Sequence, residues 1–138
     1  MKKHKNILAS LLFTGVIGLG LAAIPNGVQA QQPGLKRVDL QRHDLSAPGW
    51  EAIQVRVDFG PGVVAPRHRH PGEEIIYVLR GSIEYQVEGK PPVTLKTGDV
   101  LFVPAGAIHS AKNVGRDEAS ELATYIVEKG KPLVEPVK

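Results

Sequence analysis

Three of the five histidines lie with a glutamate in two short segments rich in glycine and proline. His68 and His70 are two residues apart, so on a strand both imidazoles point to the same face and can reach a single point. Glu74 follows soon after them, with Glu73 as a competing carboxylate, and His109 lies in the second segment. Three neutral imidazoles and one carboxylate suit a divalent transition metal such as Fe, Mn, Ni, Co, Cu or Zn. The residue types and their spacing therefore predict a metal site.

The chain between these residues has the turns needed to bring them together. A Pro-Gly pair at residues 71–72 allows a neighbouring strand to return Glu74 towards the imidazoles, and the Pro-Ala-Gly turn at residues 104–106 can present His109. The chain has no cysteine, which disfavours a closed structural zinc site. Four protein ligands on an octahedral ion leave two adjacent positions for water, dioxygen or a chelating substrate. Such an open site is typical of function rather than of structural support.

The segments that must position these residues have the two-residue period of strands. Ile53, Val55, Val57 and Phe59 alternate with polar residues, as in a half-buried strand. Similar segments lie at residues 74–79, 83–87, 93–95, 100–103 and 122–127, separated by turns rich in glycine and proline. Beyond residue 30 no stretch has a helical stripe of useful length. The pattern predicts an all-β sandwich or barrel.

The first thirty residues have the features of a secretory signal peptide. Lys2, Lys3 and Lys5 precede an apolar stretch at residues 7–24, and a small-residue end leads to Ala30. We therefore expect a signal peptide at residues 1–30, cleavage after Ala30, and a periplasmic or secreted domain at residues 31–138 with no membrane span. An uncleaved membrane anchor is the alternative, because the apolar stretch has the minimum length for crossing a bilayer.

Removal of that segment changes the charge of the protein. The whole chain has 17 basic and 14 acidic residues, and three of the basic ones lie in the first thirty residues, so the mature chain has 14 of each. With no net positive charge and no basic run, nucleic acid is not an expected partner. In an oxidising compartment a chain without cysteine must be held together by its own hydrophobic core.

The segments from Gly62 to Gly81 and from Gly98 to Asn113 resemble the two sequence motifs of the cupin superfamily, at all ten defining positions. The resemblance implies a conical β-barrel, or jelly roll, of two antiparallel sheets with a metal near its centre. Its spacing selects Glu74 over Glu73, so the implied ligands are His68, His70, Glu74 and His109. It also implies small single-domain relatives of the kind labelled quercetin-dioxygenase-like, which often form homodimers that share edge strands.

The sequence marks no catalytic group besides the metal ligands. Strand parity sends Ile76 and Val78 inward with Glu74, which predicts an apolar wall and no acid-base dyad. The candidates for the pocket rim or for contacts behind the ligands are Tyr85, Tyr125, Gln54 and Trp50, and none of them is assigned a role. Arg67 and Arg69 are expected on a solvated face and His43 in an exposed loop.

We interpret the chain as a metal-dependent, dioxygenase-like oxidoreductase acting on a small oxygen-bearing organic substrate. Two alternatives stay open, because this fold and ligand set serve several reactions. One is a binding protein that holds a small molecule without turnover. The other is a redox-neutral, metal-dependent decarboxylase, lyase or isomerase.

Overall fold

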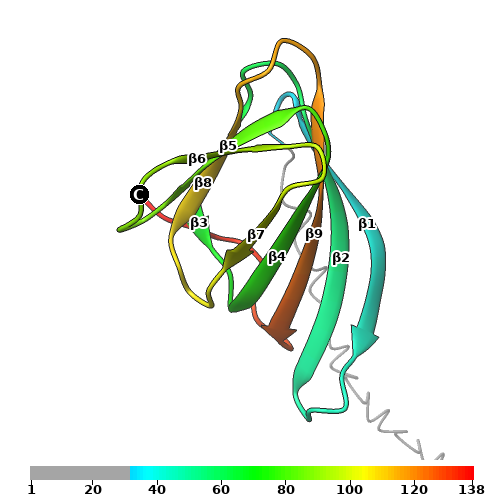
Figure 1. Cartoon of the computed structure of the whole chain (residues 1–138). Coiled ribbons are helices and arrows are strands. Elements are labelled where there is room, and N and C mark those ends of the chain that lie inside the picture. The colour runs from blue at the N-terminus through cyan, green and yellow to red at the C-terminus, as the bar shows by residue number, and fades with distance from the viewer. Residues whose placement is uncertain (1–31) are drawn as a thin grey trace, which may run out of the picture.

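The computed structural model describes residues 32–138, so the predicted signal peptide and its cleavage site lie outside the described residues. Within this part of the chain, ten strands form two sheets of five strands each. One sheet has the order β1-β2-β9-β4-β7 and the other β10-β3-β8-β5-β6 (Figure 1). The strands are β1 (Leu35–Asp44), β2 (Trp50–Phe59), β3 (Val64–Arg69), β4 (Gly72–Arg80), β5 (Ser82–Val87), β6 (Val93–Lys96), β7 (Val100–Val103), β8 (His109–Asn113), β9 (Ala119–Glu128) and β10 (Glu135–Pro136).

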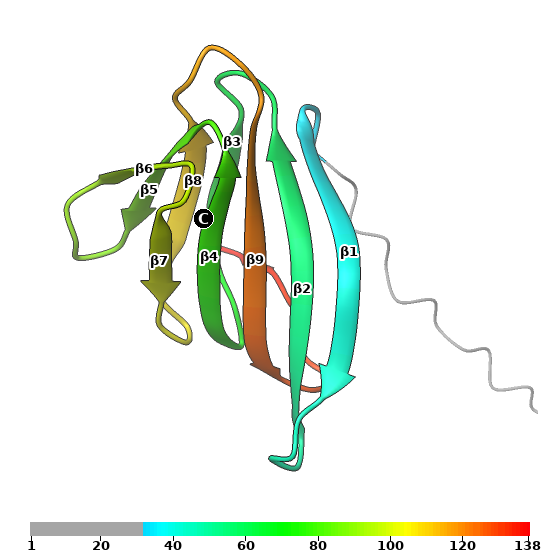
Figure 2. The ribbon, with the colours of Figure 1, turned by 45° about the vertical axis from the view of Figure 1, so that its right-hand side comes forward.

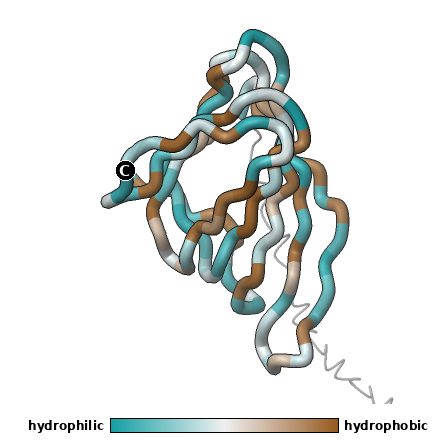
Figure 3. The backbone as a smooth tube through the Cα atoms, in the orientation of Figure 1, coloured by the Kyte–Doolittle hydropathy of each residue, from teal (hydrophilic) through white to brown (hydrophobic). Residues whose placement is uncertain are grey.

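The two sheets enclose a single hydrophobic core, as the strand pattern predicts. In β2, Ile53, Val55, Val57 and Phe59 are each at most 3% exposed, while the residues between them are half-buried. The alternation between apolar and polar residues is visible along the long strands of the first sheet (Figure 3). Every paired strand is antiparallel, and the long strands β1, β2, β9 and β4 lie side by side (Figure 2). The predicted all-β jelly-roll barrel of two antiparallel sheets is confirmed.

The structure has a longer β9 and an additional strand, β1, compared with the strands predicted from the sequence. β9 begins at Ala119, three residues before the predicted segment. The prediction missed its start because Ser120 and Glu121 are polar and yet buried, which hides the strand pattern.

β1 is mostly exposed, so it shows no alternation in the sequence. It pairs with β2 of its own chain and forms the edge of its sheet. That edge is where strands would be shared in the expected homodimer, which stays a prediction. No helix in residues 32–138 is long and apolar enough to cross a membrane.

Asn113, the last residue of the second motif, joins two loops at the end of the barrel. It is fully buried, and its amide nitrogen donates to the carbonyl oxygens of Phe59 (3.1 Å), Gly60 (3.1 Å) and Asp117 (2.8 Å). Its amide oxygen accepts from the Gly115 N–H at 2.9 Å. One side chain therefore satisfies four backbone groups, which assigns Asn113 to the fold rather than to the metal site.

We expect Asn113→Ala to lower the free energy of unfolding by about 2–4 kcal/mol, because it leaves several buried backbone groups without partners. Urea denaturation measures the loss. Asn113→Asp is a second test of the same bonds: it keeps an acceptor for Gly115 but removes both amide donors, so it should also destabilise the domain. A loss below about 1 kcal/mol for the alanine variant would mean that water replaces these bonds.

Candidate metal centre

The three predicted imidazoles meet inside the barrel. His68 is in β3 and pairs directly with His109 at the start of β8, and His70 follows the end of β3. Their exposed fractions are 8%, 2% and 3%, respectively. The ring centroids are 4.9 Å apart for His68 and His70, 4.3 Å for His68 and His109, and 5.2 Å for His70 and His109. One nitrogen of each ring lies within 4.8 Å of the others, so the three histidines could bind a metal ion.

Backbone carbonyls fix the orientation of all three rings. The Nδ1 atoms contact the oxygens of Pro66 for His68 (2.6 Å), Leu133 for His70 (2.6 Å) and Ala107 for His109 (3.0 Å). A carbonyl oxygen can only accept, so each Nδ1 carries the proton and each neutral ring has its lone pair on Nε2. This is the tautomer that a metal-binding histidine needs, with its other nitrogen held by a hydrogen bond.

Glu74 brings its carboxylate to the same point from the other sheet. It lies in β4 and is 3% exposed, and its Oε2 is 3.1 Å from Nε2 of His109 and 3.4 Å from Nε2 of His70. Glu74 Oε2 and His70 Nε2 are both buried and neither has a hydrogen bond of good geometry. Buried polar atoms are rarely left without a partner. A divalent ion between them would satisfy both atoms, so the four residues fit a metal.

The electrostatics favour an ionised Glu74 carboxylate and a neutral His68 ring. Burial raises the pKa of Glu74, but the nearby rings and charges of His109 and His70 outweigh it and hold that pKa well below its usual range. Burial lowers the pKa of His68 to about 4, helped by the charge of His109. For His109, burial lowers the pKa, but the close carboxylate of Glu74 outweighs it, so the net shift is upward. In the metal-free protein a proton on His109 therefore competes with a metal.

We expect metal affinity to fall as the pH is lowered through the raised pKa of His109, above its ordinary value of 6.5. A proton on Nε2 occupies the lone pair that the metal needs, so binding releases it and affinity rises with pH until the ring is neutral. In the region where His109 is protonated, affinity should change about tenfold per pH unit. Isothermal titration with Zn(II) at a series of pH values measures this, and a flat profile would contradict it.

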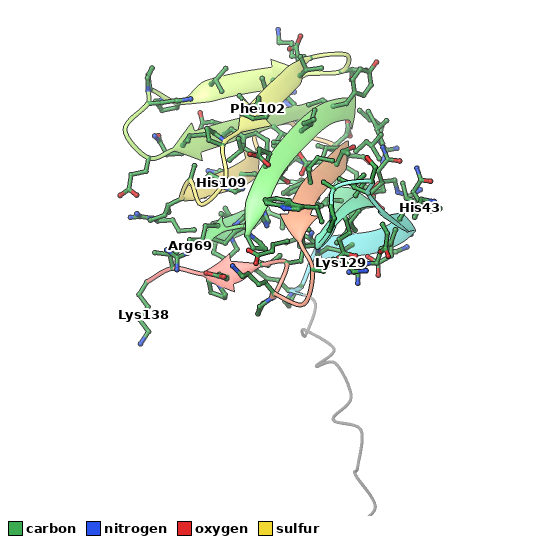
Figure 4. The ribbon with its side chains drawn as sticks, turned by 90° about the horizontal axis from the view of Figure 1, so that it is seen from below. His43, Arg69, Phe102, His109, Lys129 and Lys138 are labelled. Carbon is green, nitrogen blue, oxygen red and sulfur yellow. The ribbon has the colours of Figure 1, made fainter. Side chains whose placement is uncertain are left out.

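The remaining sequence candidates divide between the interior and the surface. Tyr85 and Tyr125 are buried in the barrel. Gln54 accepts a hydrogen bond from Gln41 of β1 and donates one to Thr124 Oγ1 of β9 at 3.0 Å. Trp50 is half-buried at the start of β2. As expected, Arg67 and Arg69 are exposed, and they pair with Glu88 and Glu135. His43 is exposed as well, but it lies on β1 and not in the predicted loop (Figure 4). Glu73 alternates with Glu74 on β4.

Ile76 and Val78 are fully buried beside Glu74 as predicted, but the barrel interior also contains polar groups that the sequence analysis did not place there. Glu121 is buried, and the Tyr85 hydroxyl donates to its Oε2 at 2.6 Å. Arg37 points inward from β1 and donates to the Tyr125 hydroxyl at 2.9 Å. The parity of β9 carries the signal that would have found the acid, because Glu121 has the same parity as Tyr125, but the predicted strand began at residue 122, one residue too late to include it.

The fold and the site together define a class: an all-β barrel of two antiparallel sheets with a group of convergent histidines suited to a metal in its interior. Residues 55–134 match the family model described as Cupin domain, and the chain belongs to this family. The match includes His68, His70, Glu74 and His109.

Known proteins similar to this chain support the assignment. The "Oxalate-binding protein" of Thermotoga maritima is 38% identical over 118 residues, which are 83% of this chain and 96% of that protein. "Germin-like protein subfamily 3 member 1" of Arabidopsis thaliana is 33% identical over 109 residues, 75% of this chain, so the chain spans 47% of that longer protein. A solved cupin-like protein of Thermotoga maritima has a TM-score of 0.62 and 27% identity, with 75% of each chain covered.

Proposed function

We propose that His68, His70, Glu74 and His109 hold a divalent transition metal and that the protein is a metal-dependent oxidoreductase. Its substrate would be a small oxygen-bearing organic molecule, and small carboxylic acids are the class that the similar proteins suggest. The observation that carries the proposal is the pair of buried atoms without partners, Glu74 Oε2 and His70 Nε2, beside three rings whose Nδ1 atoms are already engaged. The dioxygenase-like activity and the quercetin-dioxygenase-like label stay predictions.

The protein's own residues would orient the metal and balance its charge. The backbone bonds of the three histidines keep their Nε2 atoms directed inward, and the Glu74 carboxylate supplies one negative charge to a divalent ion. When bound, a redox-active ion supplies electron transfer and polarises an oxygen-bearing ligand. The buried rings of Tyr125 and Tyr85 lie beside the imidazoles, with centroid distances of 4.7 Å to His70 and 6.4 Å to His109. They exclude water from this side of the centre.

An oxygen-electrode assay on the metal-loaded protein tests the activity. Protein isolated from the exported fraction would be analysed for its metal and then mixed with oxalate, glycolate, phenols, diketones and flavonols. We expect oxygen uptake with at least one substrate, and none with the His109→Ala variant. Metal-loaded protein that consumes no oxygen with any of them would overturn the oxidoreductase proposal while leaving the metal site intact.

A second candidate is a binding protein that captures a small acid through the metal without turnover. The similar protein that this chain matches over 96% of its length is named for binding oxalate rather than for a reaction. Saturable binding of oxalate in calorimetry, with the oxalate recovered unchanged and no oxygen consumed, would favour this function. Carbon dioxide or an alkene formed without oxygen would instead indicate the redox-neutral decarboxylase or lyase.

We also propose that the protein is exported, on the sequence of residues 1–30 alone. N-terminal sequencing of the protein from the periplasm or medium should begin at Gln31. A chain that keeps residues 1–30 and sediments with the membrane would instead support the uncleaved anchor.

A further inference from the structure

A second pair of ionisable side chains crosses the barrel beside the metal centre. Glu121 is on β9 of one sheet and Tyr85 is on β5 of the other, and their exposed fractions are 3% and 2%. The Tyr85 hydroxyl lies 2.6 Å from Glu121 Oε2. At this distance either oxygen can hold the proton between them, so the pair can pass a proton in both directions.

Tyr85 is bonded to this acid and its ring also lies beside His109 of the metal centre. On the second sheet Tyr85 pairs with Ala111, and His109 is the next residue of β8 that points inward. The Tyr85 and His109 rings are nearly parallel, at 24°, with centroids 6.4 Å apart. The charge of Glu74 also acts on both Tyr85 and Glu121. The protonation of the pair is therefore sensitive to the charge at the metal centre.

The surroundings keep a proton on Glu121. Burial, and after it the charge of Glu74, raise the pKa of its carboxyl to about 8, although the bond from Tyr85 and the charge of Arg37 oppose the shift. These are the ionisable groups that face Glu121 from β4, β5 and β1, while its neighbours in register on β2 and β4 are Val57 and Val78. An acid whose pKa is close to the working pH is suited to proton transfer.

We propose that Tyr85 and Glu121 form a proton-transfer pair that serves an oxygen-bearing ligand at the centre of His68, His70, Glu74 and His109. The inference rests on the proposed metal site but does not depend on which substrate is used. The ligand oxygen gains the Tyr85 proton as the tyrosine O–H bond breaks, and Tyr85 regains a proton from Glu121. Glu121 ends as a carboxylate, and the reverse transfer restores its acid form, so no oxidant or reductant is needed. Tyr85 is the residue next to the ligand, and Glu121 acts through it.

A structural role would be the simpler explanation for this pair, and it makes a different prediction. If the bond only holds the sheets together, Glu121→Gln should change stability alone, because glutamine keeps the shape and can still accept from Tyr85. If the pair moves protons, the same variant should also change the protonation of a ligand at the metal. The test must therefore read protonation rather than activity.

The test uses the full mature chain loaded with Co(II) and follows the visible spectrum against pH. The spectrum changes when an oxygen ligand of cobalt gains or loses a proton. In the wild type we expect two coupled steps, because the carboxylate that Glu121 forms on losing its proton disfavours loss of a proton from the ligand. Glu121→Gln should give one step with its midpoint lower by about one pH unit, a tenfold change in proton affinity. Tyr85→Phe should also give a single step.

Matched measurements separate this inference from the metal site itself. Glu51→Gln removes another buried carboxylate, one that pairs with Arg42 at 3.5 Å, and should leave the titration unchanged. Infrared spectra should show a protonated carboxyl at pH 7 that Glu121→Gln removes. Unchanged cobalt midpoints in Glu121→Gln and Tyr85→Phe, or no carboxyl signal at pH 7, would overturn the inference. Failure of the wild type to bind Co(II) would overturn the proposed metal site, and the pair's role with it.

Discussion

Replacing His109 by alanine is expected to reduce metal affinity by a factor of about 100 or more. Loss of a residue that only supports a metal ligand already costs about 10–100-fold, and His109 would be a ligand itself. Its Nε2 is 3.1 Å from Glu74 Oε2. The centroid distance between the His109 and His68 rings, 4.3 Å, is the shortest among the three histidines. The variant therefore removes both a metal-binding nitrogen and the imidazole that lies 3.1 Å from the buried carboxylate. Zn(II) titration by calorimetry, with metal content after dialysis, measures the loss.

His43→Ala is the matched control, because His43 is an exposed histidine on β1 that belongs to neither motif. It should bind Zn(II) with wild-type affinity and stoichiometry. His109→Ala should keep the far-ultraviolet circular dichroism of a β-sheet protein, which separates loss of the site from loss of the fold. Wild-type affinity in a folded His109→Ala variant would show that the metal is held elsewhere, and the proposed function would then be wrong.

The residues of the candidate metal site could be predicted from the sequence because they are close in the chain or lie in turns with strong local signals. His68 and His70 need only the strand period to share a face, and the glycine and proline positions around them define how the chain returns. The structure brings the three histidines together, with Glu74 beside His70 and His109. The Leu133 carbonyl that orients His70 lies outside both motifs and could not be predicted from them.

The second pair could not be predicted in this way, because its contacts are between distant strands. Tyr85 and Glu121 are 36 residues apart, and Arg37 and Tyr125 are 88 residues apart. Which side chains meet across a barrel depends on strand order and register, and the sequence pattern shows only which face each residue occupies. A buried glutamate also interrupts the apolar alternation that reveals a strand. Because Glu121 is a charged residue at a buried position, the sequence pattern did not place it in a strand.

Gly72→Ala is expected to destabilise the domain by about 3 kcal/mol or more, which lowers Tm by at least about 12 °C in a domain of this size. Gly72 opens β4 and pairs with Val127 of β9. A Cβ added there would lie 2.0 Å from the Ile126 carbonyl oxygen and 2.8 Å from the Val127 Cα atom. Both are backbone atoms, so the strands must separate. The φ of Gly72 is not positive, so glycine is required here for space alone.

Separation of these strands should also reach the metal centre, because Glu74 is only two residues from Gly72 and itself pairs with Tyr125 of β9. We therefore expect Gly72→Ala to weaken Zn(II) binding as well as to lower the urea midpoint. Gly89→Ala is the matched control: its φ is +77° and no atom lies within 4 Å of the added Cβ. That variant has only the conformational cost of a left-handed alanine, about 1–2 kcal/mol, with unchanged Zn(II) affinity. Equal losses in both variants would mean that β4 and β9 tolerate a side chain at Gly72, and that the close backbone contact does not position Glu74.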